Sequence, residues 1–337
     1  FPLCFPSVED WISVINSSSL FSGHHSPLVY NEGFLYLRKN YESEMKLVSF
    51  FRSKNRYDNE ILKPQLLKDF QLFFDNDASI NWQKIAIFHS LTHDLSLLMG
   101  GPGTGKTYTL MVILYLFLKT FPDKKVILCA PTGKAAFRMR ESISAQASYL
   151  EDKEGFDYNI LQALKSITAQ TIHRYIKNSR YQDKNLECSF LVIDEFSMTD
   201  IKLMTHLTDL LQDETKILLI GDHHQLASVE PGSLLGDLIG TAEPNVFSRR
   251  MMDDYNRFFS VETFLNNQKK TVSSVLFSKI IELKKNWRFG ENSAIGIFSN
   301  EIKNNGNIVK ILKEADRELF MSQELQWFDI HNFNEVS

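Results

Sequence analysis

The sequence contains few cysteines, and their positions do not suggest that they cross-link the chain. Three are present among 337 residues, Cys4, Cys129 and Cys188, and they are widely separated. An odd number of distant cysteines excludes a disulfide framework and does not match the paired spacing of a zinc module. We therefore expect buried free thiols, as is usual for a protein of the reducing cytoplasm.

Long apolar runs and targeting segments are also lacking. The longest apolar stretch, from Leu110 to Leu118, is shorter than the ~20 residues that a helix needs to cross a bilayer. It predicts a buried core helix, and we expect no association with a membrane. The first residues, Phe1-Pro2-Leu3-Cys4, include neither an initiator methionine nor a basic segment. They do not resemble a signal peptide, so we expect a processed or incomplete start.

An excess of positive charge is absent as well. The net charge is −4 and the pI is near 6.2, which excludes a protein that coats nucleic acid with a uniformly basic surface. A DNA groove confined to one face is not excluded, because the local potential matters more than the net charge. Hydrophobic residues make up 43% and charged residues 23% of the 337 residues, as expected for a folded protein of two or three domains.

The chain divides into three segments by its sequence pattern. Residues 1–75 predict a mainly helical N-terminal module without a chemical motif, whose apolar side chains could serve core packing or an interface with a partner subunit. From 76 to 274, short apolar runs alternate with helical stretches, which is typical of buried parallel strands joined by crossover helices. These runs are Leu95–Met99, Val126–Ala130, Phe190–Ile193 and Ile217–Ile220. We therefore predict an α/β fold with a parallel sheet and helices on both faces.

A phosphate-binding loop follows the first of these runs. Its residues are Gly100, Gly101, Pro102, Gly103, Thr104, Gly105, Lys106 and Thr107. They match the P-loop pattern between an expected strand and an expected helix. The glycines allow backbone N–H groups to surround phosphate oxygens, and the helix N-terminus favours the negative charge. We expect Lys106 to reach the β- and γ-phosphates of ATP and Thr107 to bind Mg²⁺ through its hydroxyl.

Two carboxylates form the second half of the expected site. Asp194 and Glu195 directly follow the apolar run Phe190–Ile193. Because parallel strands end at a common crevice, Asp194 can face the P-loop and hold Mg²⁺. Glu195 is then placed to orient or deprotonate the attacking water. Alone, the pair could equally open a surface helix, but together with the P-loop it indicates a nucleotide hydrolase.

Further motifs carry a resemblance to a known family. In chain order they are Asn81-Trp82-Gln83-Lys84, Cys129–Ala136, Thr171-Ile172-His173-Arg174, Ile220–Val229 and Leu283–Phe289. This order resembles superfamily 1 helicases. Over residues 80–310 it is most similar to the RecD family, the alpha subunit of bacterial exodeoxyribonuclease V. The resemblance implies a P-loop NTPase with RecA-like domains that hydrolyses ATP to move 5′ to 3′ on single-stranded DNA, with RecB- and RecC-like partner subunits, in break repair and recombination.

The resemblance also implies roles for individual residues. Gln83 would hydrogen-bond the adenine edge, and Gln225 would sense the γ-phosphate from a strand between the P-loop strand and the Asp-Glu strand. Arg288 would act as an arginine finger from a second RecA-like domain. The residues that would line the DNA path are Pro131, Thr132, Thr171 and His173. We interpret Trp287 mainly as a packing residue, with base stacking as the alternative.

The sequence departs from the family pattern near its end. Two motifs of the second RecA-like domain, a Gln-Gly element and a Thr-Arg-Ala-type element, do not occur before Ser337. We therefore expect residues 275–337 to begin that domain without completing it, and the chain alone to be weakly active. A catalytically inert fragment that binds nucleotide and DNA through subunit contacts is the alternative. A P-loop kinase or GTPase is disfavoured, because Asp194-Glu195 and Gln225 suit water as the nucleophile.

Overall fold

The computed structural model describes residues 5–21, 26–75, 80–181, 188–222, 234–240, 242–261, 276 and 278–287. Its centre is a six-stranded sheet, ordered β5-β4-β6-β7-β3-β8, in which every neighbouring pair is parallel. The strands are β3 (Leu95–Met99), β4 (Val126–Ala130), β5 (Ala169–Thr171), β6 (Phe190–Ile193), β7 (Lys216–Gly221) and β8 (Ile280–Glu282). The four predicted apolar runs are confirmed as β3, β4, β6 and β7.

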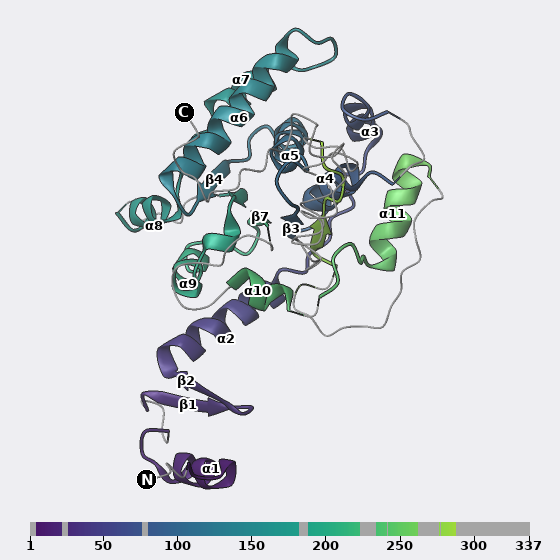
Figure 1. Ribbon diagram of the computed structural model, residues 1–337. Coiled ribbons are helices and arrows are strands. Elements are labelled where there is room, and N and C mark those ends of the chain that lie inside the picture. The colour runs from purple at the N-terminus through teal and green to yellow at the C-terminus, as the bar shows by residue number, and fades with distance from the viewer. Residues whose placement is uncertain are drawn as a thin grey trace, which may run out of the picture.

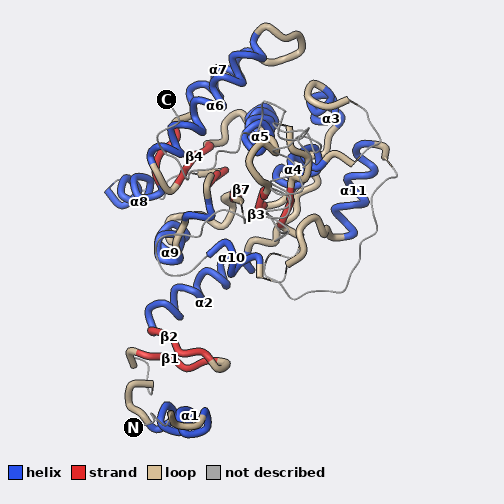
Figure 2. Tube along the Cα trace, in the orientation of Figure 1, coloured by secondary structure: helices blue, strands red, loops and turns tan. Residues whose placement is uncertain are grey.

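Helices cover both faces of this sheet (Figures 1 and 2). Successive strand residues point to opposite faces, and they enter two different cores. Val192 packs in one core with α3 (Pro64–Gln71), α4 (Trp82–Thr92), α5 (Lys106–Thr120), α6 (Gly133–Glu151), α7 (Tyr158–Ser166) and α11 (Arg249–Phe259). Leu191 packs in the other with α2 (Arg38–Ser53), α8 (Ile172–Tyr181), α9 (Ile201–Thr208) and α10 (Leu234–Ile239). The predicted RecA-like P-loop fold, with strands buried on both faces, is confirmed.

The N-terminal segment does not form one separate module. Leu47 and Phe51 of α2 belong to one core of the sheet, and Leu66 and Phe70 of α3 belong to the other. Only α1 (Val8–Ser17) and the antiparallel hairpin of β1 (Leu28–Asn31) and β2 (Phe34–Leu37) extend away from the sheet, beyond α2 (Figure 1). The expected boundary at residue 75 therefore falls within packed structure, because α2 and α3 bury their apolar faces against the sheet.

The sheet also continues past residue 275, where we expected a second domain to begin. Strand β8 pairs in parallel with β3, with Leu97 opposite Ile280 and Met99 opposite Glu282. Ile280 and Ile281 are buried, one in each core. Residues 280–282 thus form an edge strand of the first sheet, and this correction moves the start of any second domain beyond them.

Candidate nucleotide site

The P-loop connects β3 to α5 as predicted. Gly103 and Gly105 adopt positive φ angles of 82° and 86°, which favour glycine, and Gly105 forms the N-cap of α5. Helix α5 begins at Lys106, whose ammonium donates hydrogen bonds to the carbonyls of Gly100 at 2.5 Å and Gly101 at 3.1 Å. The lysine is therefore held within the loop, at the N-terminus of the helix where phosphate would bind.

The loop has little room for side chains at two of its glycines. A Cβ atom at Gly100 would lie 2.6 Å from Oγ1 of Thr104, and one at Gly105 would lie 2.5 Å from Nε2 of Gln83. The second distance shows that the amide of Gln83 lies directly against the phosphate loop. Gln83 lies in the first turn of α4, and Asn81 is the N-cap of this helix. The Oδ1 of Asn81 accepts from the backbone N–H groups of Gln83 and Lys84 at 3.0 and 3.1 Å.

Asp194 directly follows β6 and is half-buried. Burial raises its pKa to about 6; the backbone N–H of Glu195 and the charge of Lys106 act in the opposite direction. That N–H donates to Oδ1 of Asp194 at 2.9 Å. Glu195 itself adopts a φ of +52°, a strained conformation for a residue with a side chain. A desolvated carboxylate opposite the lysine fits a bound cation, which would stabilise its charged form.

The described part of the chain contains no group of three or more His, Cys, Asp or Glu side chains that could hold a metal ion without other ligands. The protein ligands predicted from the sequence are one hydroxyl and one carboxylate, those of Thr107 and Asp194. Mg²⁺ is commonly held by one or two carboxylates together with phosphate oxygens. The donor set therefore fits a magnesium ion that arrives with a nucleotide.

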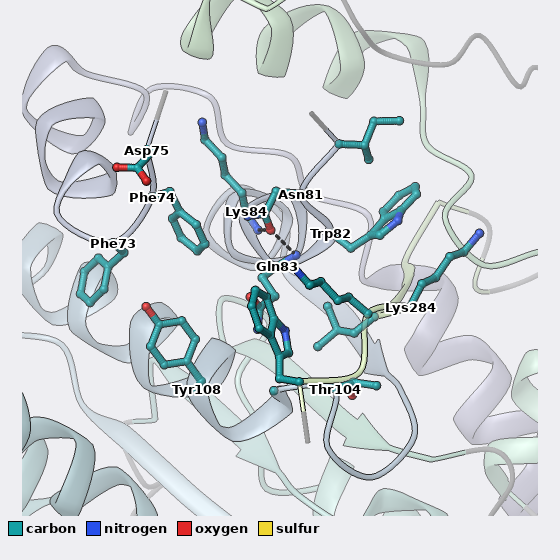
Figure 3. Close-up of a pocket in the computed structure, with 15 residues that line it drawn as sticks. Phe73, Phe74, Asp75, Asn81, Trp82, Gln83, Lys84, Thr104, Tyr108 and Lys284 are labelled. Carbon is teal, nitrogen blue, oxygen red and sulfur yellow. Dashed lines mark hydrogen bonds between the residues drawn. The ribbon is translucent and has the colours of Figure 1, made fainter. Parts of the chain in front are cut away.

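A cavity of about 680 Å³ opens beside the P-loop. Its lining includes Gln83, Thr104, Gly105, Tyr108 and Trp287. Figure 3 shows Phe73, Phe74 and Tyr108 on one side of the pocket and Trp82 and Lys284 on the other. A pocket lined by aromatic side chains next to a phosphate loop can accept a heterocyclic base by stacking.

Trp287, which we interpreted mainly as a packing residue, lies beside the P-loop. Its side chain is 59% exposed and lines the cavity, and its Cδ1 lies 3.5 Å from the position of a Cβ at Gly105. Tyr108 was not predicted. Its position two residues after Lys106 places it in the first turn of α5, and an aromatic residue there was the signal that could have identified it.

The four residues expected to line a DNA path come together at one edge of the sheet. Ala130 at the end of β4 pairs with Thr171 at the end of β5, so Pro131-Thr132 and Thr171-His173 are neighbours. Both threonines cap helices: Thr132 accepts from Ala135 N–H and Thr171 from Arg174 N–H, each at 3.2 Å. His173 is exposed.

Two expected catalytic residues, Gln225 and Arg288, lie outside the described residues. The strand that precedes Gln225 is described. Strand β7 lies between β3 and β6, which is the predicted order of the P-loop strand, the Gln225 strand and the Asp-Glu strand. The C-terminal ends of the three strands therefore meet in the order that we expected.

Comparison with known proteins agrees with these motifs. The family model described as AAA domain matches residues 83–231. The chain is 31% identical over 290 residues to the RecBCD enzyme subunit RecD of Buchnera aphidicola from Acyrthosiphon pisum, an alignment that covers 83% of this chain and 46% of that protein. It is 28% identical to the same subunit of Haemophilus influenzae, covering 88% and 48%. By sequence, the chain is RecD-like.

This RecD-like chain spans about half the length of the curated relatives it matches. Among solved structures, it is similar to the Pif1 helicase of Candida albicans with 23% identity and a TM-score of 0.30, covering 45% of this chain and 34% of that one. No helix among the described residues is long and apolar enough to cross a membrane.

Proposed function

We propose that this RecD-like chain supplies the ATP-binding domain of a DNA helicase subunit that moves 5′ to 3′ on single-stranded DNA during break repair and recombination. The observation that carries the proposal is the joint presence of a P-loop, the half-buried carboxylates Asp194 and Glu195 and an adjacent aromatic pocket on one RecA-like sheet. The similarity to RecD subunits over most of the chain supports the assignment of DNA as the polymer along which the protein moves.

The nucleotide is ATP, held by residues from three elements. Gln83 hydrogen-bonds the edge of adenine, since an amide donates and accepts at once. The loop amides and Lys106 bind the phosphates, and Thr107 with Asp194 holds Mg²⁺, which neutralises developing charge. Glu195 takes the proton of the attacking water. Gln225 couples the γ-phosphate to DNA, and Arg288 supplies the arginine finger.

The DNA path runs over the ends of β4 and β5. The helices α6 and α8 both begin there, so their N-terminal N–H groups and the hydroxyls of Thr132 and Thr171 face the same edge. Pro131 and His173 complete this surface. Such contacts reach the DNA backbone and carry little sequence information, so binding is expected to be largely independent of sequence.

The partners are RecB- and RecC-like subunits, in the cytoplasm. An unusual concentration of exposed apolar side chains supports a subunit interface on α1 and the β1–β2 hairpin. Trp11 is 53% exposed and Phe34 is 66% exposed, and α1 has no buried residue. Exposed apolar patches of this kind are typical of protein interfaces.

The test is steady-state ATP hydrolysis with and without single-stranded DNA. In the full-length protein, Lys106→Ala should reduce turnover ~10³-fold or more, because the lysine stabilises charge in the transition state. Lys202→Ala on the exposed face of α9 is the control and should leave turnover unchanged. A Lys106→Ala protein that keeps a tenth of wild-type turnover would refute the site. Nucleotide and DNA binding without any turnover in the wild-type chain would favour the inert fragment instead.

A further inference from the structure

The segment that follows β8 runs alongside the P-loop. The N–H of Leu283 donates to the carbonyl of Met99 at 2.8 Å, which continues the pairing of β8 with β3. Further along, the amide Nδ2 of Asn286 donates to the carbonyl of Pro102 at 3.1 Å. The next residue, Trp287, donates its backbone N–H to the carbonyl of Gly103 at 2.8 Å. Residues far apart in sequence therefore hold two successive carbonyls of the phosphate loop.

A bond to a carbonyl also orients the neighbouring N–H group. The peptide unit is planar and trans, so the C=O of Pro102 and the N–H of Gly103 point in opposite directions. With the Pro102 carbonyl held toward Asn286, the N–H of Gly103 points away from Asn286. Gly103 has a φ of +82°. Because glycine adopts positive and negative φ angles about equally easily, its own backbone preference does not fix this conformation, and an external contact can do so.

We propose that Asn286 is a positioning residue for the nucleotide, which fixes the Pro102–Gly103 peptide so that the Gly103 N–H points at the phosphates before the nucleotide arrives. The inference deepens the proposed function and rests on it for the identity of the ligand. Trp287 holds the next carbonyl, that of Gly103, through its backbone N–H, and no side-chain substitution removes that bond. The side chain of Asn286 is thus the part of this contact that can be tested.

Nucleotide affinity is the first test. Asn286→Ala should weaken binding of ADP, measured by calorimetry, about fivefold, since it removes one net hydrogen bond from the organised loop. Asn286→Asp should weaken it at least as much, because a carboxylate cannot donate to the Pro102 carbonyl. Asn286→Gln, which keeps the amide, should recover part of the loss.

Asn245, in the loop before α11, provides a matched control because it contacts the strand that precedes Asn286. Its Nδ2 donates to the carbonyl of Glu282 at 3.1 Å, and its Oδ1 accepts from the N–H of Glu282 at 2.9 Å. It thus holds β8 without contacting the P-loop. Asn245→Gly tolerates the native φ of +62° and removes both bonds. It should lower the melting temperature yet leave ADP affinity unchanged. An equal loss of affinity in both variants would overturn the proposal in favour of a general effect through β8.

Hydrogen exchange in the nucleotide-free protein tests the positioning itself. Asn286→Ala should speed deuterium uptake in the peptide that contains Gly101–Gly105, while Asn245→Gly should speed it only around β8. Unchanged exchange of the loop in Asn286→Ala would reject the inference even if ADP binds. Absence of ADP binding in the wild-type protein would reject the proposed function, and the exchange result would still decide the role of Asn286.

Discussion

The imidazole rings of His89 and His93 lie face to face, with their centroids 3.8 Å apart and their planes 2° apart. His89 is fully buried, with Nδ1 2.7 Å from Oγ of Ser96 and Nε2 2.7 Å from the carbonyl of Ser278. The carbonyl can only accept, so Nε2 carries the proton and Nδ1 accepts from the serine in a neutral ring. Stacked, buried rings of this kind favour the uncharged form of both histidines.

This pair should make the fold sensitive to acid. Burial lowers the pKa of His89 to about 4 and also lowers that of His93, with the neighbouring His89 as a further cause. Unfolded histidine titrates near ~6.5, so between there and about pH 4 the unfolded chain binds protons that the folded chain does not. Stability should therefore fall as the pH falls through this window, by up to about 1.4 kcal/mol per pH unit for each histidine.

Urea unfolding at several pH values checks this prediction. His93→Phe keeps an aromatic ring beside His89 and cannot be protonated, so its stability should fall less steeply with decreasing pH than that of the wild type. Asp194 titrates in the same range but is present in both proteins, so its contribution cancels in the comparison. Parallel curves for the two proteins would show that His93 does not titrate on unfolding.

Lys54 should stabilise the fold through hydrogen bonds to three backbone carbonyls. The residue is buried just after α2, and its ammonium donates to the carbonyls of Gln212, Asp213 and Thr215 at 3.3, 2.7 and 3.0 Å. Lys54→Met fills the space of the side-chain stem but leaves these carbonyls without their donor. We expect a loss of about 2–4 kcal/mol in the free energy of unfolding.

Lys46, within α2, is the control for Lys54. It forms an ion pair with Asp209, but its side chain is 50% exposed. Exposed ion pairs contribute at most about 1 kcal/mol, so Lys46→Met should change stability little. Chemical denaturation of both variants separates the two cases, and equal losses would mean that the carbonyl contacts of Lys54 carry no special weight.

Single-stranded DNA should bind across the ends of β4 and β5. Arg174 is exposed there, three residues after Thr171. Arg174→Ala should weaken binding for all sequences alike and reduce the slope of log affinity against log salt by about 1. Lys153 lies just past the C-terminal end of α6, with its ammonium over the ring of Tyr149. Lys153→Ala should therefore change neither the DNA affinity nor the salt slope. Equal effects of both variants in a fluorescence titration would place the DNA elsewhere.

Local patterns in the sequence predicted the centre of this fold and missed its edges. Strands β3, β4, β6 and β7 are buried on both faces, so they stand out as continuous apolar runs. Strand β5, Ala169–Thr171, is short and partly polar, and β8 is equally short, so neither has a comparable signal. The placement of α2 and α3 in the two cores depends on tertiary packing, which composition cannot reveal.

The same distinction applies to the site. The P-loop and the Asp194-Glu195 pair are contiguous motifs whose chemistry is visible in sequence. The structure places them after β3 and β6 of one sheet, with β7 between these strands. The wall formed by Tyr108 and Trp287 joins residues that only the fold brings together. The contact between Asn286 and Pro102 is of the same kind, because it depends on β8 joining the edge of the sheet beside β3.

Glu195→Gln should separate nucleotide binding from hydrolysis. Glutamine has nearly the same shape, so the strained backbone at φ +52° and the N–H donated to Asp194 should remain. What is lost is the ability to take a proton from water, a step that contributes roughly 10²–10⁴ in rate. Turnover should fall by that factor while ATP affinity stays close to wild type, and complexes with ATP and DNA should persist longer. Glu151→Gln, which changes a carboxylate paired with Lys165 away from the P-loop, should leave turnover intact. Near-normal hydrolysis by Glu195→Gln, measured in single-turnover assays, would mean that Glu195 serves the turn after β6 and that another group accepts the proton.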